Sequence, residues 1–238
     1  MFLRSIVTLL TSTIAFAGAA EAFTPDRAYF FQQCDAIPGF SQRVGSSTVT
    51  EGPAIRLRAS ARETINSFFD EWESIDGQDQ RHLAFIIATT YRETMGRMQS
   101  IREAPQCGED EACRDRAIDR AYARPNENGQ RYYGRGFVQL TGHSNYQRAT
   151  RTFGVDFVSN PDLALDPIHA RQILFRGMIE GWFSSEPDGT RRTLSFYFND
   201  EREDWLNARK IVNPGSSRRE VTAALAQHFN SCLRQAPS

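Results

Sequence analysis

Lysine is almost absent from this sequence: Lys210 is the only lysine among 28 basic residues. Arginine therefore carries the positive charge, and residues of both signs are spread along the chain to a formal net charge of −1. Such a balanced chain lacks the basic excess typical of proteins that bind nucleic acids or are drawn strongly to anionic envelopes. We expect no nucleic-acid partner.

Long apolar runs are also scarce. The one uncharged apolar run, residues 5–17, follows Arg4 and precedes small residues that end in Ala20, Glu21 and Ala22. These are the parts of a secretory signal peptide. The run is shorter than the ~20 residues that a bilayer span requires. We expect residues 1–22 to be a signal peptide and the remaining chain to be exported, periplasmic or secreted, without stable membrane insertion.

Metal-binding patterns are missing as well. The histidines are scattered, and neither HExxH nor CxxC occurs, so the sequence implies no metal and no cofactor. The four cysteines form an even set, for which disulfides are the expected state in an exported chain. Three pairings are possible. The simplest joins Cys107 to Cys113 across a short polar loop and Cys34 to Cys232 near the two ends of the mature chain.

The chain shows no internal repeat or low-complexity tract that would indicate several domains. Residues 23–52 are rich in proline, glycine and small polar residues, so we expect an irregular lead-in that Cys34 ties down. Residues 53–238 are then long enough for a single catalytic domain. We expect this domain to act as a monomer.

Most of that domain has the pattern of helices. The stretches that begin near Ser60 and Gln80 carry apolar residues at the spacing i, i+3, i+4, i+7, and those that begin near Asp166 and Ser217 also have an apolar helical face. Capping signals precede several of them. Only residues 136–141 are typical of a strand. The fold class is therefore α+β and mostly α-helical.

Glu93 is the first candidate for chemistry. It lies near the end of the second predicted helix, at the margin of the apolar stripe beside Ile86, and Gly96 is a plausible end for that helix. Partial burial there would favour the protonated form, which a general acid needs near neutral pH. The alternative is an ordinary helix-end carboxylate paired with Arg97, and position alone favours that alternative.

Glu103 is a candidate partner, ten residues further along. Inverting glycosidases hold their two carboxylates about 6.5–9.5 Å apart, whereas a continuous helix would separate these residues by ~15 Å, so the helix must stop between them. Taken alone, Glu103 is more typical of a loop glutamate that pairs with Arg102 or Arg135. Three neighbouring acids are rival bases: Glu109, Asp110 and Glu111.

The segment YYGRGFVQLTGHSNY, residues 132–146, is the most informative stretch. Its glycines allow close backbone approach, its tyrosines can stack on sugar rings, and its amide and hydroxyl side chains can make directional hydrogen bonds to acetamido groups. A β-hairpin with a polar end would have the same composition. Composition alone does not choose between these readings.

This segment resembles the YYGRGxxQL(S/T)xxxNY segment of the chitinase-like family 19 glycoside hydrolases, which include plant-type chitinases and bacterial and phage cell-wall lysins. YRETMGRM, residues 91–98, is similar to the catalytic HET segment of that family, and NPDLALDP and NARKIVNPG match two later motifs. The resemblance covers residues 80–229. It implies a lysozyme-like domain with a small β-hairpin beside the cleft, and hydrolysis of a β-1,4 bond in an N-acetylglucosamine-containing polysaccharide.

Roles carry over by position. The resemblance implies that Glu93 is the general acid, Glu103 the general base, and Thr141 a residue that holds the attacking water, in an inverting mechanism without a cofactor. The positions expected to contact the sugar chain are Tyr133, Arg135, Gln139, Asn145, Tyr146 and Asn213. For Arg135, bracing of the hairpin is the alternative, and for Tyr132 bracing is the expectation.

The sequence departs from the family at several points. Arg92 replaces the histidine that usually precedes the acid, and we expect its side chain to point away from the cleft because adjacent helical residues lie about 100° apart. Glu103 lies in a divergent loop, and Pro214 follows Asn213. A lytic transglycosylase or a catalytically inactive glycan-binding protein are the alternatives. The substrate is peptidoglycan or chitin, with peptidoglycan slightly favoured.

Overall fold

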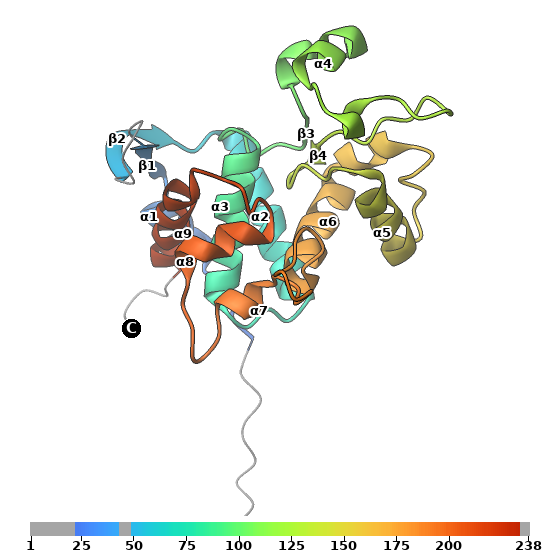
Figure 1. Ribbon diagram of the computed structural model, residues 1–238. Helices are drawn as coiled ribbons and strands as arrows, with labels where there is room; N and C mark the ends of the chain where they lie inside the picture. Colours follow the sequence, from blue (N-terminus) through green and yellow to red (C-terminus); the bar gives the residue numbers. More distant parts are fainter. Residues whose placement is uncertain (1–21, 43–48, 234–238) are drawn as a thin grey trace, which may run out of the picture.

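The computed structural model describes residues 22–42 and 49–233, so residues 1–21 of the predicted signal peptide lie outside the described part. The main body is a group of helices around α3 (Gln80–Glu93), whose residues 83–90 are all buried. Helices α2 (Ala59–Ser74), α6 (Pro167–Glu180) and α9 (Arg219–Leu233) pack against α3. Figure 1 shows a smaller part, with α4 (Glu111–Ala117), extending from this body.

Helix α3 sets the position of Glu93 because both of its ends are fixed. At its start, the side chain of Asp79 accepts a hydrogen bond from the backbone N–H of Arg81. At its end, the hydroxyl of Thr94 donates to the carbonyl of Thr90 at 2.7 Å. Gly96 then takes a positive φ of 74°, which a residue with a Cβ adopts at a cost. The predicted helix and its end are confirmed.

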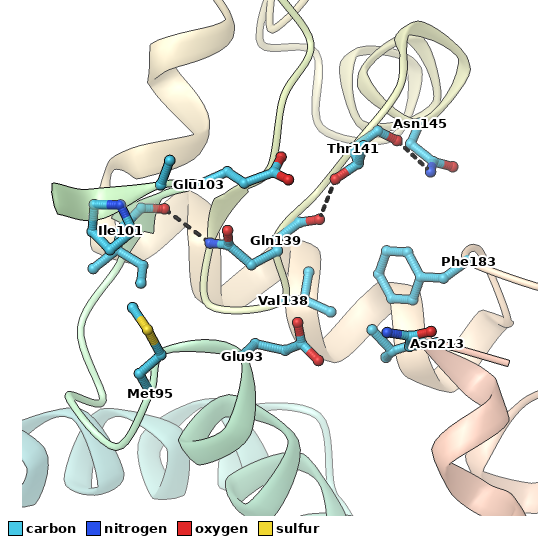
Figure 2. A pocket seen from close by; sticks show the side chains of 13 residues that line it. Glu93, Met95, Ile101, Glu103, Val138, Gln139, Thr141, Asn145, Phe183 and Asn213 are labelled. Atoms are coloured by element: carbon cyan, nitrogen blue, oxygen red, sulfur yellow. Dashed lines mark hydrogen bonds between the residues drawn. The ribbon is translucent and has the colours of Figure 1, made fainter. Parts of the chain in front are cut away.

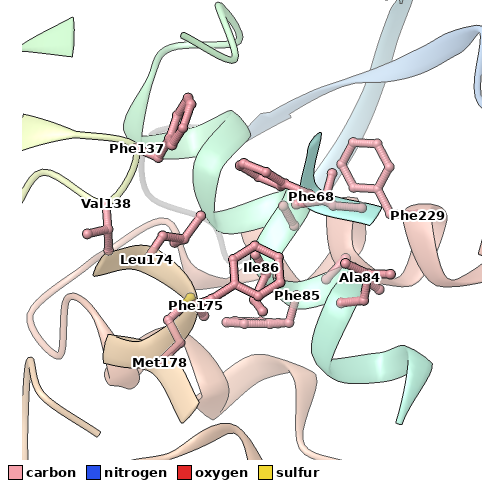
Figure 3. Packing of buried hydrophobic residues seen from close by; sticks show 14 of the residues in the cluster. Phe68, Ala84, Phe85, Ile86, Phe137, Val138, Leu174, Phe175, Met178 and Phe229 are labelled. Atoms are coloured by element: carbon pink, nitrogen blue, oxygen red, sulfur yellow. The ribbon is translucent and has the colours of Figure 1, made fainter. Parts of the chain in front are cut away.

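The other predicted helices are present too. The Asp166 side chain accepts hydrogen bonds from the N–H groups of Ile168 and His169 and so caps α6, whose C-cap is the left-handed Gly181. The apolar faces pack into one core. Figure 3 shows Phe68 of α2 between Phe137 and Phe175, whose ring centroids lie 5.2 and 5.5 Å away in edge-on contacts.

The prediction of an irregular lead-in over residues 23–52 is wrong. This region contains helix α1 (Arg27–Gln33) and strand β1 (Ala36–Gln42), which pairs antiparallel with β2 (Val49–Arg56). The helix forms because Asp26 caps it and because Phe30 is fully buried against the core. Pro38 lies where the strand register shifts, and there its missing N–H is tolerated.

The predicted strand at residues 136–141 is also wrong in extent. Only Arg135–Gly136, strand β4, pairs with β3 (Ile101–Arg102). The chain then turns, Gln139 takes a positive φ of 55°, and the Leu140 N–H donates back to the Arg135 carbonyl at 2.8 Å. Phe137 is buried by this turn, because its ring packs on Phe68. The turn is thereby anchored to the core below the site.

The smaller part has little core of its own. It contains η1 (Pro105–Cys107), α4 and η2 (Ala121–Ala123), and a second hydrophobic cluster of Ile118, Ala123 and Tyr133. The remaining elements are α5 (His143–Phe153), η3 (Pro161–Leu165), α7 (Leu194–Tyr197), α8 (Trp205–Ala208) and η4 (Arg209–Ile211).

Both expected disulfides are present, Cys34–Cys232 in the main body and Cys107–Cys113 in the smaller part. Within the described residues, no helix combines the length and the apolar character needed to cross a bilayer. The described chain is mostly α-helical with two small two-stranded sheets, which confirms the α+β class.

Candidate active site

A cleft of about 480 Å³ lies between the main body and the smaller part. Figure 2 shows Glu93 at the end of α3 on one wall and Glu103 on the opposite wall, where Thr141 and Asn145 also lie. Six residues predicted for the site line this cleft together: Glu93, Glu103, Gln139, Thr141, Asn145 and Asn213. Met95, Ile101, Ala104, Pro105, Val138, Phe183 and Val212 complete its walls.

Glu93 is held by an ion pair that the sequence analysis missed. Its Oε1 accepts a hydrogen bond from Nη2 of Arg209, which belongs to η4, and the two side chains are only 16% and 7% exposed. The alternative pairing with Arg97 does not occur. Arg209 lies four residues before Asn213, so its place in the late NARKIVNPG segment was the available signal.

Arg92 does not line the cleft and contributes instead to a neighbouring hollow. This agrees with the expectation that its side chain points away from Glu93. The residue that replaces the usual histidine of the family therefore lines this hollow, although the charges of Glu93 and Arg209 still act on its pKa.

Glu103 is held by two hydrogen bonds, one on each oxygen. Its Oε1 accepts from the hydroxyl of Tyr122 at 2.9 Å, and its Oε2 accepts from the backbone N–H of Gly134 at 2.7 Å. A Cβ at position 134 would lie 2.9 Å from Gln139 Oε1 and 3.2 Å from Glu103 Oε2, so glycine permits this close approach. Both oxygens accept hydrogen bonds, which suits a carboxylate that acts as a base.

The rival acids are engaged elsewhere. Glu109 pairs with Arg102 at 2.7 Å, and Glu111 pairs with Arg114 at 2.8 Å. Asp110 caps α4 by accepting from the Cys113 N–H. None of the three lines the cleft. The geometry therefore favours Glu103 among the acids considered.

Tyr122 was not foreseen as a site residue. Burial and the hydrogen bond to Glu103 raise the pKa of its phenol to about 12. The phenol therefore stays protonated and keeps donating to Glu103 over the ordinary pH range. Its hydrogen bond to Glu103 spans 19 positions of a loop, and no periodic pattern in the sequence indicates it.

The segment that carries Glu103 is held by a buried arginine. Arg114 of α4 is buried, and its Nε donates to the carbonyl of Glu103 at 3.1 Å while its Nη2 donates to the carbonyl of Gly108. The Cys107–Cys113 disulfide closes the next stretch of chain, which begins four residues after Glu103. The position of Glu103 thus depends on the smaller part rather than on the core.

Thr141, Gln139 and Asn145 form a chain of hydrogen bonds along the wall near Glu103. The Thr141 hydroxyl donates to the Gln139 carbonyl at 2.8 Å, which leaves its oxygen as an acceptor. The Gln139 amide nitrogen donates to the carbonyl of Ile101 at 3.0 Å, and that of Asn145 donates to the carbonyl of Thr141 at 2.8 Å. The side-chain carbonyl oxygens of Gln139 and Asn145 can each accept a hydrogen bond from the N–H of an acetamido group.

Three residues expected to contact the sugar chain do not line the cleft. Tyr133, Arg135 and Tyr146 are 1%, 4% and 0% exposed. The Arg135 guanidinium lies over the Tyr133 ring at 3.7 Å, donates to the Tyr146 hydroxyl at 3.1 Å and pairs with Asp162 at 2.7 Å. The aromatic faces thus stack on arginine rather than on sugar. These residues brace the turn, as expected for the alternative role of Arg135.

Tyr132 also has a bracing position. Its hydroxyl donates to the carbonyl of Val158 at 3.1 Å, and its ring lies 5.2 Å from that of Tyr146. Burial raises the pKa of both tyrosines, which keeps their hydroxyls as donors.

Similar proteins cover parts of the chain. Chitinase 8 of Oryza sativa subsp. japonica is 40% identical over 84 residues, which are 35% of this chain and 29% of that protein. The basic endochitinase of Vitis vinifera is 31% identical over 118 residues, 47% of this chain and 36% of that protein. The matches thus span only about a third of these relatives. Chitinase C from Streptomyces griseus HUT6037 aligns over 91% of this chain and 95% of its own, with a TM-score of 0.49 and 19% identity.

A model of one protein family matches residues 60–189, more than half of the 238-residue chain, and its description is chitinase class I. The matched range includes both walls of the cleft from Glu93 to Asn145, whereas Arg209 and Asn213 lie beyond it. The chain belongs to glycoside hydrolase family 19.

Proposed function

We propose that this protein hydrolyses β-1,4-glycosidic bonds in an N-acetylglucosamine-containing polysaccharide by inversion. The observation that carries the proposal is the meeting of Glu93 and Glu103 across one cleft whose walls also present Gln139, Asn145 and Asn213. Two carboxylates on opposite sides of the scissile bond are what acid and base catalysis of this reaction require.

The two carboxylates differ in their surroundings, and their different roles follow the family resemblance. Glu93 lies at the end of a core helix with its carboxyl group oriented by Arg209. It donates a proton to the leaving glycosidic oxygen. Glu103 takes a proton from a water that attacks the opposite face of the sugar, and the Thr141 hydroxyl oxygen accepts a hydrogen bond from the same water. Proton exchange with solvent then restores both groups.

The relatives named above are chitinases, which supports chitin as the polysaccharide that is hydrolysed. Peptidoglycan carries the same type of linkage, and we retain it as the slightly favoured substrate. The two disulfides support an oxidising compartment, periplasmic or extracellular, where a monomer would meet either polymer.

The test compares wild type, Glu93→Gln and Glu103→Gln on chitin hexamer and on purified sacculi, with products identified by mass and anomer by NMR. Glu109→Gln is the matched control, because Glu109 lies close in sequence but outside the cleft. We expect the first two variants to lose about 10²–10⁴ in kcat, the control to keep its activity, and the first product to be the α-anomer.

Other outcomes identify the alternatives. Full activity of Glu103→Gln would exclude this residue as the base. Anhydro-sugar products would indicate a lytic transglycosylase, in which Glu93 acts without a water-activating partner. Tight binding of intact glycan without turnover by wild type would indicate a glycan-binding protein.

A further inference from the structure

Two further hollows of about 380 and 350 Å³ adjoin the cleft at Met95. Met95 lines all three spaces, and Tyr91, Gly96 and Ile55 line both hollows, so the hollows lie side by side next to the cleft. Four arginines line the two hollows in addition to Arg56: Arg58, Arg92, Arg97 and Arg218. We call the two hollows, with these four arginines, the basic groove.

The four arginines of the basic groove make no direct ion pair within the described residues. In the part of the chain that the structure describes, none of its four arginines has a carboxylate within 4 Å. The nearby carboxylates already have cationic partners: Asp35 pairs with Arg62 and lies 3.7 Å from Arg56, Glu93 pairs with Arg209, and Glu220 lies 3.6 Å from Arg219. An anion that enters the groove would therefore find Arg58, Arg92, Arg97 and Arg218 without a carboxylate in direct contact.

The arginines are also close enough to repel one another. Burial lowers the pKa of Arg92, and the positive charges of Arg218 and Arg209 lower it further, while the charge of Glu93 offsets part of this effect. Like charges gathered in a partly desolvated hollow raise the free energy of the empty site, and a bound anion relieves that repulsion. The formal net charge of the whole chain is −1, so this clustering is local.

The floor of the groove is apolar where it meets the cleft. Ile55 and Met95 are 54% and 59% exposed, which is high for such side chains, and the Tyr91 ring lies between the hollows. A fitting ligand carries carboxylates on an aliphatic chain and is joined to a glycan that lies in the cleft. Chitin is uncharged and has no such branch. In peptidoglycan, short peptides with free carboxylates branch from the lactyl group of every second sugar.

We propose that the basic groove binds the carboxylates of the peptide branches of peptidoglycan and so directs the cleft toward peptide-bearing strands rather than chitin. This inference rests on the proposed function, since it assumes that the glycan lies between Glu93 and Glu103.

The primary test measures binding rather than turnover. Glu103→Gln serves as the background, because Glu103 lines the cleft but not the groove. Isothermal titration compares two tetrasaccharides of alternating N-acetylglucosamine and N-acetylmuramic acid at low salt, one with its peptides and one whose lactyl carboxyl groups are primary amides instead of peptide-bearing. We expect the peptide-bearing ligand to bind about three- to tenfold more tightly, as for a few partly exposed charge pairs.

The variant Arg58→Gln/Arg218→Gln removes one exposed arginine from each hollow. We expect it to abolish most of the preference for the peptide-bearing ligand and to reduce the salt dependence of binding. The matched control is Arg151→Gln/Arg191→Gln, which removes two exposed arginines outside the groove. This control should keep the full preference.

Three results would overturn the inference: equal binding of both tetrasaccharides, equal loss of preference in both double variants, or equally tight binding of a sulfated oligosaccharide of similar charge. A separate turnover assay with wild type tests the proposed function. Hydrolysis of chitin hexamer and of both tetrasaccharides with the same kcat/KM would leave the proposed function intact while contradicting the groove. Preferential binding without any hydrolysis would contradict the proposed function alone.

Discussion

At the scale of single residues, the two facing carboxylates are held by groups of different chemistry. Glu93 meets a guanidinium from a segment 116 positions away, whereas Glu103 meets a phenol and a backbone amide. An arginine orients a carboxyl group through both charge attraction and directional hydrogen bonds, whereas a neutral donor orients it through a directional hydrogen bond alone.

Tyr122→Phe tests the neutral donor. The substitution removes the hydrogen bond to Glu103 Oε1 and leaves the ring in place. Since a hydrogen bond to a charged group contributes about 1.5–3 kcal/mol, we expect kcat to fall about tenfold or more with little change in KM. Because the pKa of Tyr122 is raised to about 12, the loss should be the same at mildly acidic and mildly alkaline pH.

Steady-state kinetics on chitin hexamer measures this effect, and Tyr29→Phe in α1 is the matched control. An unchanged kcat for Tyr122→Phe would mean that the Gly134 amide alone positions Glu103.

Several site residues could be predicted from the sequence, and others could not. Glu93, Gln139, Thr141 and Asn145 lie in short contiguous motifs, so their resemblance to a family was readable. Arg209 and Tyr122 act through contacts that only folding creates. For Tyr133, Arg135 and Tyr146 the motif was recognised but the direction of the side chains was not. Tyrosine rings can stack on a sugar or on an arginine, so the motif alone does not decide between these contacts.

At the scale of elements, Glu93 and Glu103 belong to parts of the fold that differ in how much buried core surrounds them. Glu93 ends a helix whose middle is fully buried, while Glu103 precedes the loop closed by Cys107–Cys113 and is held by buried Arg114 next to that disulfide. Loss of the loop should therefore affect activity more than folding.

Cys107→Ser/Cys113→Ser tests that expectation. The disulfide spans a sequence separation of only 6 residues, so its removal should lower the free energy of unfolding by no more than about 2 kcal/mol. We expect kcat to fall severalfold in protein that is still fully folded. Activity assays beside urea denaturation followed by circular dichroism measure the two effects. Unchanged kcat would show that Arg114 and Tyr122 suffice to hold the loop.

The helices could be predicted because the spacing of apolar residues and the capping residues are visible within a short stretch of sequence. The two small sheets could not, because each strand is defined by its partner. Strand β4 exists only where Ile101 and Arg102 lie opposite Arg135 and Gly136, more than 30 positions away. The helix α1 is short, and its stability comes from burying Phe30 against Phe69 and Phe229, which are distant in sequence.

At the scale of the whole molecule, Cys34–Cys232 joins the region after α1 to the last turn of α9, over a sequence separation of 198 residues. Cys34→Ala/Cys232→Ala should lower the free energy of unfolding by about 5 kcal/mol, since a long loop is released in the unfolded chain. Thermal unfolding measures this loss. The variant should keep its kcat at temperatures where it is folded, in contrast to the loop variant.

Stability should also depend on pH in a defined way. Burial raises the pKa of Tyr91, Tyr133 and Tyr197 above 10.0, so the unfolded chain releases protons first and stability falls as the pH rises past about 10. Burial lowers the pKa of His82 below 6.5, so the unfolded chain takes up a proton first and stability falls below about 6.5. Urea unfolding across this range should show a plateau between the two values.

A flat profile through pH 6 would contradict the assignment to His82. As a control, His82→Gln should weaken the dependence on the acidic side and leave the alkaline side unchanged.

Charge is the property for which the whole sequence was least informative. A net charge of −1 with interspersed signs indicated no attraction to anionic polymers, because composition does not reveal which arginines fold together. The basic groove draws its arginines from the start of α2, the end of α3 and the segment before α9.

Met95 gives this arrangement a chemical weak point. Its thioether side chain is 59% exposed where the cleft and the two hollows join. Oxidants convert exposed methionine to a sulfoxide, which is polar and bulkier. One such event at this junction would alter the walls of all three spaces at once, without touching either carboxylate. A peroxide-sensitive sulfur atom therefore lies where the cleft with its two carboxylates adjoins the basic groove.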